Sequence, residues 1–145
     1  ATTACTFASP ALRRSRSVAT TSSGPSCVSR TTTTSRLPTM LNIANQCAKS
    51  ISGVGVISAR VVKPLDEKIL LKIKDTPLIV LEENSTIGGL GSMITLFYSN
   101  NKVQTKALCL GVEDAFVKHG SVDEQLVDIR LDCQSVIRKI LDFIE

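Results

Sequence analysis

The chain has 145 residues, enough for one domain of ordinary size, and a formal net charge of +4 at pH 7. The excess charge lies in residues 1–40, which hold five arginines and no acidic residue, whereas the rest of the chain has 12 basic and 13 acidic residues. Because that larger part has no basic excess, and the chain has no tryptophan and one tyrosine, the composition does not support nucleic-acid binding. No apolar run approaches the roughly 20 residues of a membrane-spanning helix, so we expect neither a nucleic-acid nor a membrane partner.

Residues 1–38 are rich in Ser, Thr and Arg and contain almost no large apolar side chains. Such a segment buries too little apolar surface to offset the entropy of ordering it, so we expect it to be disordered. Its Arg-rich, Ser-rich and acid-free composition is also typical of an organelle transit peptide, which predicts a plastid or a related organelle. A plain disordered linker, a wrongly joined gene segment and a cytoplasmic location are the alternatives.

From Thr39 onward, apolar residues recur with the periods of helices and strands. The pattern predicts helices from Thr39 to Gly53, from Asp66, from the glycines after residue 87 to Tyr98, from Asp123 and from Asp132, and strands over 54–62, 78–81 and 106–110. The residues expected to face the core from these helices are Met40, Ile43, Ala44, Cys47, Ile51, Ile69, Leu70, Ile73, Leu126, Val127, Val136, Ile137, Ile140, Leu141 and Ile144.

Helices and strands therefore alternate over residues 39–145, which form the predicted domain. This alternation predicts βαβ units and an α/β fold of three layers, α/β/α, with a mostly parallel sheet. Only three strands are clear, which is few for a sheet covered on both faces.

The stretch Leu78–Ser92 organises this pattern: an apolar run, two carboxylates, and then Gly88, Gly89, Gly91 and Ser92 before a helix. Backbone N–H groups at a helix N-terminus can bind an anion, so these four residues are candidates for a phosphate site. The alternative is that the glycines allow tight packing between strand and helix, or positive φ. The spacing matches neither GxGxxG nor GxxxxGK[ST], which favours the packing role.

Three other kinds of side chain carry chemistry. Glu82 and Glu83 are neighbours on a strand and point to opposite faces, so we expect a solvated or loop-bonding role and no acid–base pair. His119 is a weak candidate for binding a phosphate, but no motif places a partner beside it, which favours a surface role. The five cysteines contain no Cys-x-x-Cys pair, so we expect no metal site and no disulfide framework. Three of them are interpreted as core residues of a reducing compartment, namely Cys47, Cys109 and Cys133.

Three segments, Ala59–Asp66, Leu81–Ser92 and Leu110–Ser121, together resemble one family. Their order and spacing are similar to those of the C-terminal domain of 1-deoxy-D-xylulose-5-phosphate synthases, within the transketolase C-terminal fold. The segment Asp128–Asp132 resembles the one that leads into that family's last helix, so the resemblance covers residues 39–145. It implies a three-layer α/β/α domain with a mixed five-stranded sheet, which is the third domain of a larger transferase.

The resemblance also implies a function. The complete enzyme uses thiamine diphosphate and magnesium to decarboxylate pyruvate and join the two-carbon unit to glyceraldehyde 3-phosphate, on the route to isoprenoids. Its catalytic and cofactor-binding residues lie in its first two domains, so we expect no catalytic, cofactor-binding or metal residue here. The implied role is structural and dimer-supporting, with a second copy or the remaining domains as partner, and the chain alone would be inactive. A free-standing interaction module and the C-domain of a 2-oxo acid dehydrogenase β-subunit stay open as alternatives.

Two departures from the family bear on the fold. Before Thr39, the family has an apolar strand that ends in a Gly-Thr-Met turn and lies in the middle of its sheet, whereas this chain has Thr31–Pro38. We therefore expect either that Thr31–Leu37 replaces that strand or that the domain lacks its first strands, with open edges. The second departure is Arg130, which stands in a turn where the family commonly has glycine.

Overall fold

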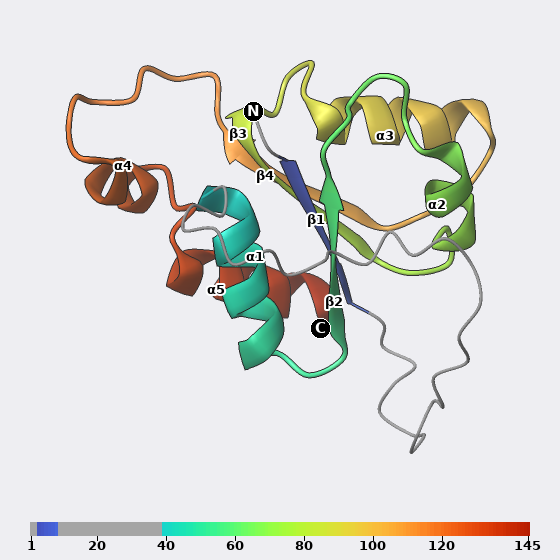
Figure 1. Cartoon of the computed structure of the whole chain (residues 1–145), viewed down its shortest axis with the longest axis horizontal. Coiled ribbons are helices and arrows are strands. Elements are labelled where there is room, and N and C mark those ends of the chain that lie inside the picture. Colours follow the sequence, from blue (N-terminus) through green and yellow to red (C-terminus); the bar gives the residue numbers. More distant parts are fainter. Residues whose placement is uncertain (1–2, 9–38) are drawn as a thin grey trace.

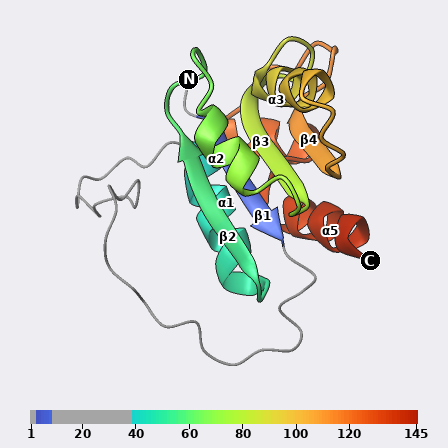
Figure 2. The same ribbon diagram turned by 90° about the vertical axis from the view of Figure 1, so that its right-hand side faces the viewer.

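The computed structural model describes residues 3–8 and 39–145, over which a four-stranded sheet lies between two layers of helices (Figures 1 and 2). The strand order is β2-β1-β3-β4. The strands are β1 (Thr3–Ala8), β2 (Val54–Ala59), β3 (Leu78–Ser85) and β4 (Ala107–Val112). The helices are α1 (Thr39–Ser50), α2 (Glu67–Lys72), α3 (Leu90–Asn100), α4 (Val122–Asp128) and α5 (Cys133–Ile144). The predicted three-layer α/β/α class is confirmed.

Three of the four strands of the sheet run in the same direction, but two of its three strand pairings are antiparallel. β3 pairs with β4 in parallel, whereas β1 is antiparallel to both of its neighbours, β2 and β3. β2, β3 and β4 therefore run the same way, and the central strand β1 runs against them. The sheet is mixed, as the family resemblance implied.

The expectation of disorder throughout residues 1–38 is wrong for Thr3–Ala8, which form the central strand. Thr6 lies opposite Val56 on one side and Ile79 on the other, so β1 supplies backbone partners to both β2 and β3. Without β1, the facing edges of β2 and β3 would have unpaired backbone groups, which is costly. Thr and Phe, which occur in this segment, have high strand propensity. The position proposed for Thr31–Leu37 is thus taken by β1, while residues 9–38 lie outside the described residues.

β3 holds the two halves of the core together, because its side chains alternate between the two faces of the sheet. Ile79 and Leu81 pack with α1 and α5, whereas Leu78 and Val80 pack with α2 and α3. All four are at most 1% exposed, which confirms the prediction of a strand covered on both faces.

The helix stripes largely follow the sequence pattern. In α1, the four predicted residues from Met40 to Cys47 are buried, and so is Ile51, which directly follows the helix. In α5, Val136 and Ile140 are buried. Two expectations are wrong: Val127 is 61% exposed and Leu141 is 44% exposed. Leu141 is rotated about 100° around α5 from Ile140, at the margin of the stripe. Val127 belongs to α4, which has no buried residue and lies away from the sheet in Figure 1.

Arg130 lies in the turn after α4, where the family commonly has glycine, and it adopts a backbone conformation typical of glycine. Its φ is 55°, in the left-handed region that glycine adopts most easily. The N–H of Arg130 donates to the Val127 carbonyl (3.0 Å), and that of Leu131 donates to the Leu126 carbonyl (2.8 Å), which ends α4. The turn directs the chain so that Leu131, 1% exposed, enters the core.

The central position of β1 predicts that Thr6→Pro lowers the free energy of unfolding by about 2 kcal/mol or more, because proline removes a ladder donor from the middle of a sheet. Thr3→Pro is the matched control, since Thr3 is the first residue of the strand and pairs with Ala59 alone. Urea denaturation measures both. Equally small effects would show that β1 contributes nothing to the stability of the sheet.

Candidate functional site

Glu82 is a fully buried acidic residue in the second half of β3 (Leu78–Ser85). Glu82 is 0% exposed, and its Oε2 accepts a hydrogen bond from the Leu90 N–H at 2.8 Å. Its Oε1 accepts one from the Gly91 N–H at 3.2 Å. Both oxygens thus bind the N-terminus of α3, where the helix dipole also favours a negative charge. The N-cap residue, Gly89, makes no side-chain cap, so Glu82 caps α3 from the neighbouring strand.

Three glycines surround this carboxylate, and none has room for a side chain. A Cβ on Gly89 would lie 2.5 Å from the Ser85 carbonyl oxygen and against Glu82 Oε2. On Gly91 it would lie 2.5 Å from Cys109 Sγ, and on Gly111 it would lie 2.7 Å from the Asn84 carbonyl oxygen. Glycine is therefore needed here so that β3, β4 and α3 can approach one another closely.

Other polar groups of the loop bind one another. Gly88 adopts a φ of +76°, and its N–H donates to Ser92 Oγ at 3.2 Å. Ser92 Oγ in turn donates to the Thr86 carbonyl at 2.6 Å. An external anion at this helix would have to replace the Glu82 carboxylate, because the Leu90 and Gly91 donors already bind it. The structure brings Gly88, Gly89, Gly91 and Ser92 together in the arrangement that the packing interpretation describes.

Glu83 is exposed and Glu82 is buried, so the two carboxylates lie on opposite faces as the strand pattern predicted. Sequence reasoning missed the capping role of Glu82. The signal was a helix with glycine, and no Ser, Thr, Asp or Asn, at the cap position, whose first residue, Leu90, lies eight residues after a glutamate.

Cys109 of β4 lies on the same side of the sheet as this carboxylate. Burial raises the pKa of the Cys109 thiol, and the Glu82 charge raises it further. The thiol therefore stays protonated at neutral pH, which agrees with its interpretation as a core residue.

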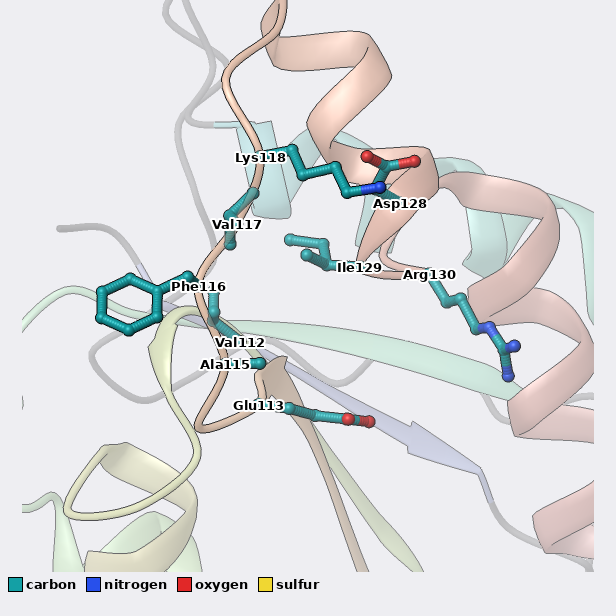
Figure 3. Close-up of a pocket in the computed structure, with 9 residues that line it drawn as sticks. All are labelled: Val112, Glu113, Ala115, Phe116, Val117, Lys118, Asp128, Ile129 and Arg130. Carbon is teal, nitrogen blue, oxygen red and sulfur yellow. The ribbon is translucent and has the colours of Figure 1, made fainter.

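A second concave region lies between the segment that follows β4 and the turn from α4 to α5. It encloses about 510 Å³ and is lined by both acids and bases, among them Glu113, Lys118, Asp128 and Arg130. In Figure 3 the Lys118 side chain points toward the Asp128 carboxylate, whereas the Phe116 ring points away from the cavity. Two charges of each sign select neither an anion nor a cation. His119 is exposed and does not line this cavity.

Residues 113–128 form an extended segment followed by α4, which we call the α4 arm. Ser121 and Glu124 form a capping box, in which the Glu124 carboxylate accepts hydrogen bonds from the Ser121 N–H (2.9 Å) and Oγ–H (2.7 Å). These bonds hold the pKa of Glu124 below its usual value. The arm nevertheless exposes apolar side chains, namely Phe116 (105%), Val122 (62%), Val127 (61%) and Val117 (37%).

Within the described residues there is no group of three or more His, Cys, Asp or Glu side chains arranged to hold a metal ion. A search of the same residues finds no helix long and apolar enough to span a membrane.

The cap predicts that Glu82→Ala destabilises the domain by about 2 kcal/mol or more, because two buried N–H groups lose their acceptor. Glu83→Ala, the exposed neighbour on the same strand, should change the free energy of unfolding by less than about 0.5 kcal/mol. Chemical denaturation of both variants measures the difference. Similar values would contradict a capping role for Glu82.

The close approach at Gly91 predicts that Gly91→Ala destabilises by more than about 1 kcal/mol, since the new methyl group would overlap Cys109 Sγ. Gly55→Ala is the control, because a Cβ there meets nothing within 4 Å. Thermal unfolding followed by circular dichroism distinguishes the two. A harmless Gly91→Ala would show that α3 can move away from β4 at no cost.

Comparison with known proteins identifies the family. The model of the family "Transketolase, C-terminal domain" matches residues 31–136. The 1-deoxy-D-xylulose-5-phosphate synthase of Chlorobaculum tepidum is 37% identical over 111 residues, which cover 72% of this chain and 18% of that protein. The synthase of Aquifex aeolicus is 32% identical over 104 residues, covering 70% and 17%.

A third similar protein is the synthase of Carboxydothermus hydrogenoformans, 40% identical over 92 residues that cover 59% of this chain and 15% of the relative. The chain thus spans less than a fifth of the length of these relatives. The family match extends from before α1 into α5 and includes β2, β3, β4 and the glycine loop described above. The chain belongs to the transketolase C-terminal domain family.

Proposed function

We propose that this chain acts as the C-terminal, non-catalytic domain of an enzyme similar to 1-deoxy-D-xylulose-5-phosphate synthase. The observation that carries the proposal is the use of Glu82: each oxygen of this carboxylate accepts a hydrogen bond from a backbone N–H group of α3, and the side chain is fully buried, away from any substrate in solvent. The relatives support it, because the matched segment is 15–18% of each of those three proteins.

In this proposal, thiamine diphosphate and magnesium bind to the other domains of the enzyme and not to this chain. Those domains carry out the transfer of a two-carbon unit from pyruvate to glyceraldehyde 3-phosphate. A plastid or related organelle is our proposal for the location, on the Arg-rich and Ser-rich composition of residues 1–38, with the cytoplasm as the alternative. A transit peptide that is removed cannot include β1 (Thr3–Ala8), because this strand lies inside the folded sheet.

The α4 arm is the surface through which we propose that the domain contacts the rest of the enzyme. Phe116 is fully exposed and α4 buries no residue, although its capping box orders it. A soluble domain gains little from exposing Phe116 beside Val117, Val122 and Val127 unless a partner covers them. We assign the remaining domains as that partner, and a second copy of this chain is the competing occupant.

The synthase names of these relatives favour this proposal over the C-domain of a 2-oxo acid dehydrogenase β-subunit. A free-standing interaction module would use the same exposed arm, but it would work without the catalytic domains. Reconstitution with those domains distinguishes the two.

The proposal predicts that the complete chain, with β1 included, supports release of carbon dioxide from pyruvate when it is placed in the Chlorobaculum tepidum synthase in exchange for the matching segment. In that chimera, Phe116→Asp should lower the melting temperature by about 5 °C or more, because a charge would lie in an apolar contact. Leu96→Asp is the matched control, since Leu96 is 62% exposed on α3, outside the arm.

The isolated chain is the negative control in this assay, and we expect it to release no carbon dioxide from pyruvate. In calorimetric titration, we expect it to bind no thiamine diphosphate. Turnover by the isolated chain would overturn the non-catalytic role. Equal effects of the two Asp variants would show that the arm is not the contact, and dimerisation of the isolated chain that Phe116→Asp abolishes would assign the arm to a second copy.

A further inference from the structure

Two thiols from distant parts of the sequence meet between α1 and α5. Cys47 Sγ lies 4.0 Å from Cys133 Sγ, and the two residues are 86 positions apart in the chain. Cys47 is fully buried in α1, whereas Cys133, the first residue of α5, is partly exposed. The Cys47 thiol also lies 3.8 Å from the Cys133 carbonyl oxygen.

The surroundings hold both sulfur atoms in place. Cys47 belongs to the core cluster with Met40, Ile43 and Ala44, and Cys133 packs against that cluster. α1 and α5 lie in the same helical layer, on the face of the sheet opposite α2 and α3 (Figure 2). The two thiols are therefore neighbours because the fold packs α1 against α5.

We propose that Cys47 and Cys133 form a modification site: a pair of thiols that an oxidant converts into a disulfide joining α1 to α5. This inference stands on the contact between the two sulfur atoms and does not depend on the proposed function. It revises the expectation that the cysteines act only as small core residues.

With hydrogen peroxide as the oxidant, the reaction has two steps. The Cys133 sulfur attacks one peroxide oxygen, an S–O bond forms as the O–O bond breaks, and water leaves, so that Cys133 becomes a sulfenic acid. The Cys47 sulfur then attacks the Cys133 sulfur, the S–S bond forms as the S–O bond breaks, and the thiol proton leaves with the hydroxide as a second water. Two thiols lose two electrons, and the peroxide gains them.

Exposure sets this order. Cys133 is a partly exposed residue at the start of α5, whereas Cys47 is 0% exposed. Burial, followed by the neighbouring Cys133, raises the pKa of Cys47 to about 12, so Cys47 stays a protonated thiol at neutral pH. Cys47 therefore does not meet the oxidant first, and it gives up its proton as its sulfur attacks the sulfenic acid of Cys133.

Forming the disulfide requires the two sulfur atoms to move closer together. A disulfide requires the sulfur atoms to move from 4.0 Å to about 2.05 Å apart, which rotation of the two side chains and a slight shift of α5 can supply. The bond would close a loop of more than 80 residues in the unfolded chain, and loops of that size give large entropic stabilisation. We therefore expect the oxidised domain to melt at least about 5 °C higher than the reduced one.

Cys109 provides a matched control within the same chain. It is also partly buried, but it lies in β4 and packs in the other core cluster, with α3. Its sulfur lies close to Gly91, on the face of the sheet opposite the contact between Cys47 and Cys133. Cys109→Ala should leave the oxidation of the pair unchanged.

The test treats the complete chain with hydrogen peroxide and maps the disulfide by mass spectrometry of unreduced peptides, which separates this pair from Cys5, Cys27 and Cys109. We expect a Cys47–Cys133 linkage, a raised melting temperature that dithiothreitol reverses, and loss of both in Cys133→Ser but not in Cys109→Ala. The reversal by dithiothreitol keeps the test valid if Cys133→Ser unfolds, because it compares identical chains.

Free Cys47 and Cys133 after treatment, Cys133 oxidised to a sulfinic acid without linkage, or linkage of either residue to another cysteine would overturn the proposal. A linked protein that melts below the reduced form would also overturn it, since the bond would then distort the contact between α1 and α5.

Discussion

The fold depends on one pair of buried hydrogen bonds, which the Glu82 carboxylate of β3 accepts from the first backbone N–H groups of α3. A buried carboxylate without partners would be expensive, and a helix N-terminus without a cap would leave N–H groups unpaired. Each group satisfies the other. This contact constrains the loop between β3 and α3. Gly89, Gly91 and Gly111 have no room for a side chain, because β3, β4 and α3 pack closely around the carboxylate.

This contact also explains why a loop that looks like an anion site in the sequence is internally complete. Glycines, a helix N-terminus and a serine are the parts from which phosphate sites are built. Here the anion comes from the protein itself, at residue 82, and Ser92 Oγ closes the loop by binding the Thr86 carbonyl. Glycines at a helix N-terminus can therefore allow close packing, and bind no external anion, when a carboxylate of the neighbouring strand caps the helix.

Much of the fold could be predicted from the sequence because its local patterns agree with its packing. The apolar run at Leu78–Leu81 identified the buried strand, and the stripe from Met40 to Ile51 identified α1. The central strand could not be predicted, since Thr3–Ala8 has a composition like that of its surroundings and its partners lie far away in the chain. The cap by Glu82 was missed for the same reason: it joins a strand to the helix eight residues later, outside the spacing of local capping motifs. The pairing of Cys47 with Cys133 spans 86 positions, which no spacing rule can detect.

The position of β1 has a consequence for how the protein is made. Thr3–Ala8 is synthesised before both of its partners, and Ala4 pairs with Leu81, which the ribosome adds 77 residues later. At about 5–20 residues per second, the segment waits roughly 4–15 s before its second neighbour exists. Its other neighbour, β2, is available earlier, so the antiparallel ribbon of β1 and β2 can form first and later receive β3 on its open side. During translation, therefore, the middle of the finished sheet is for a time an unpaired edge.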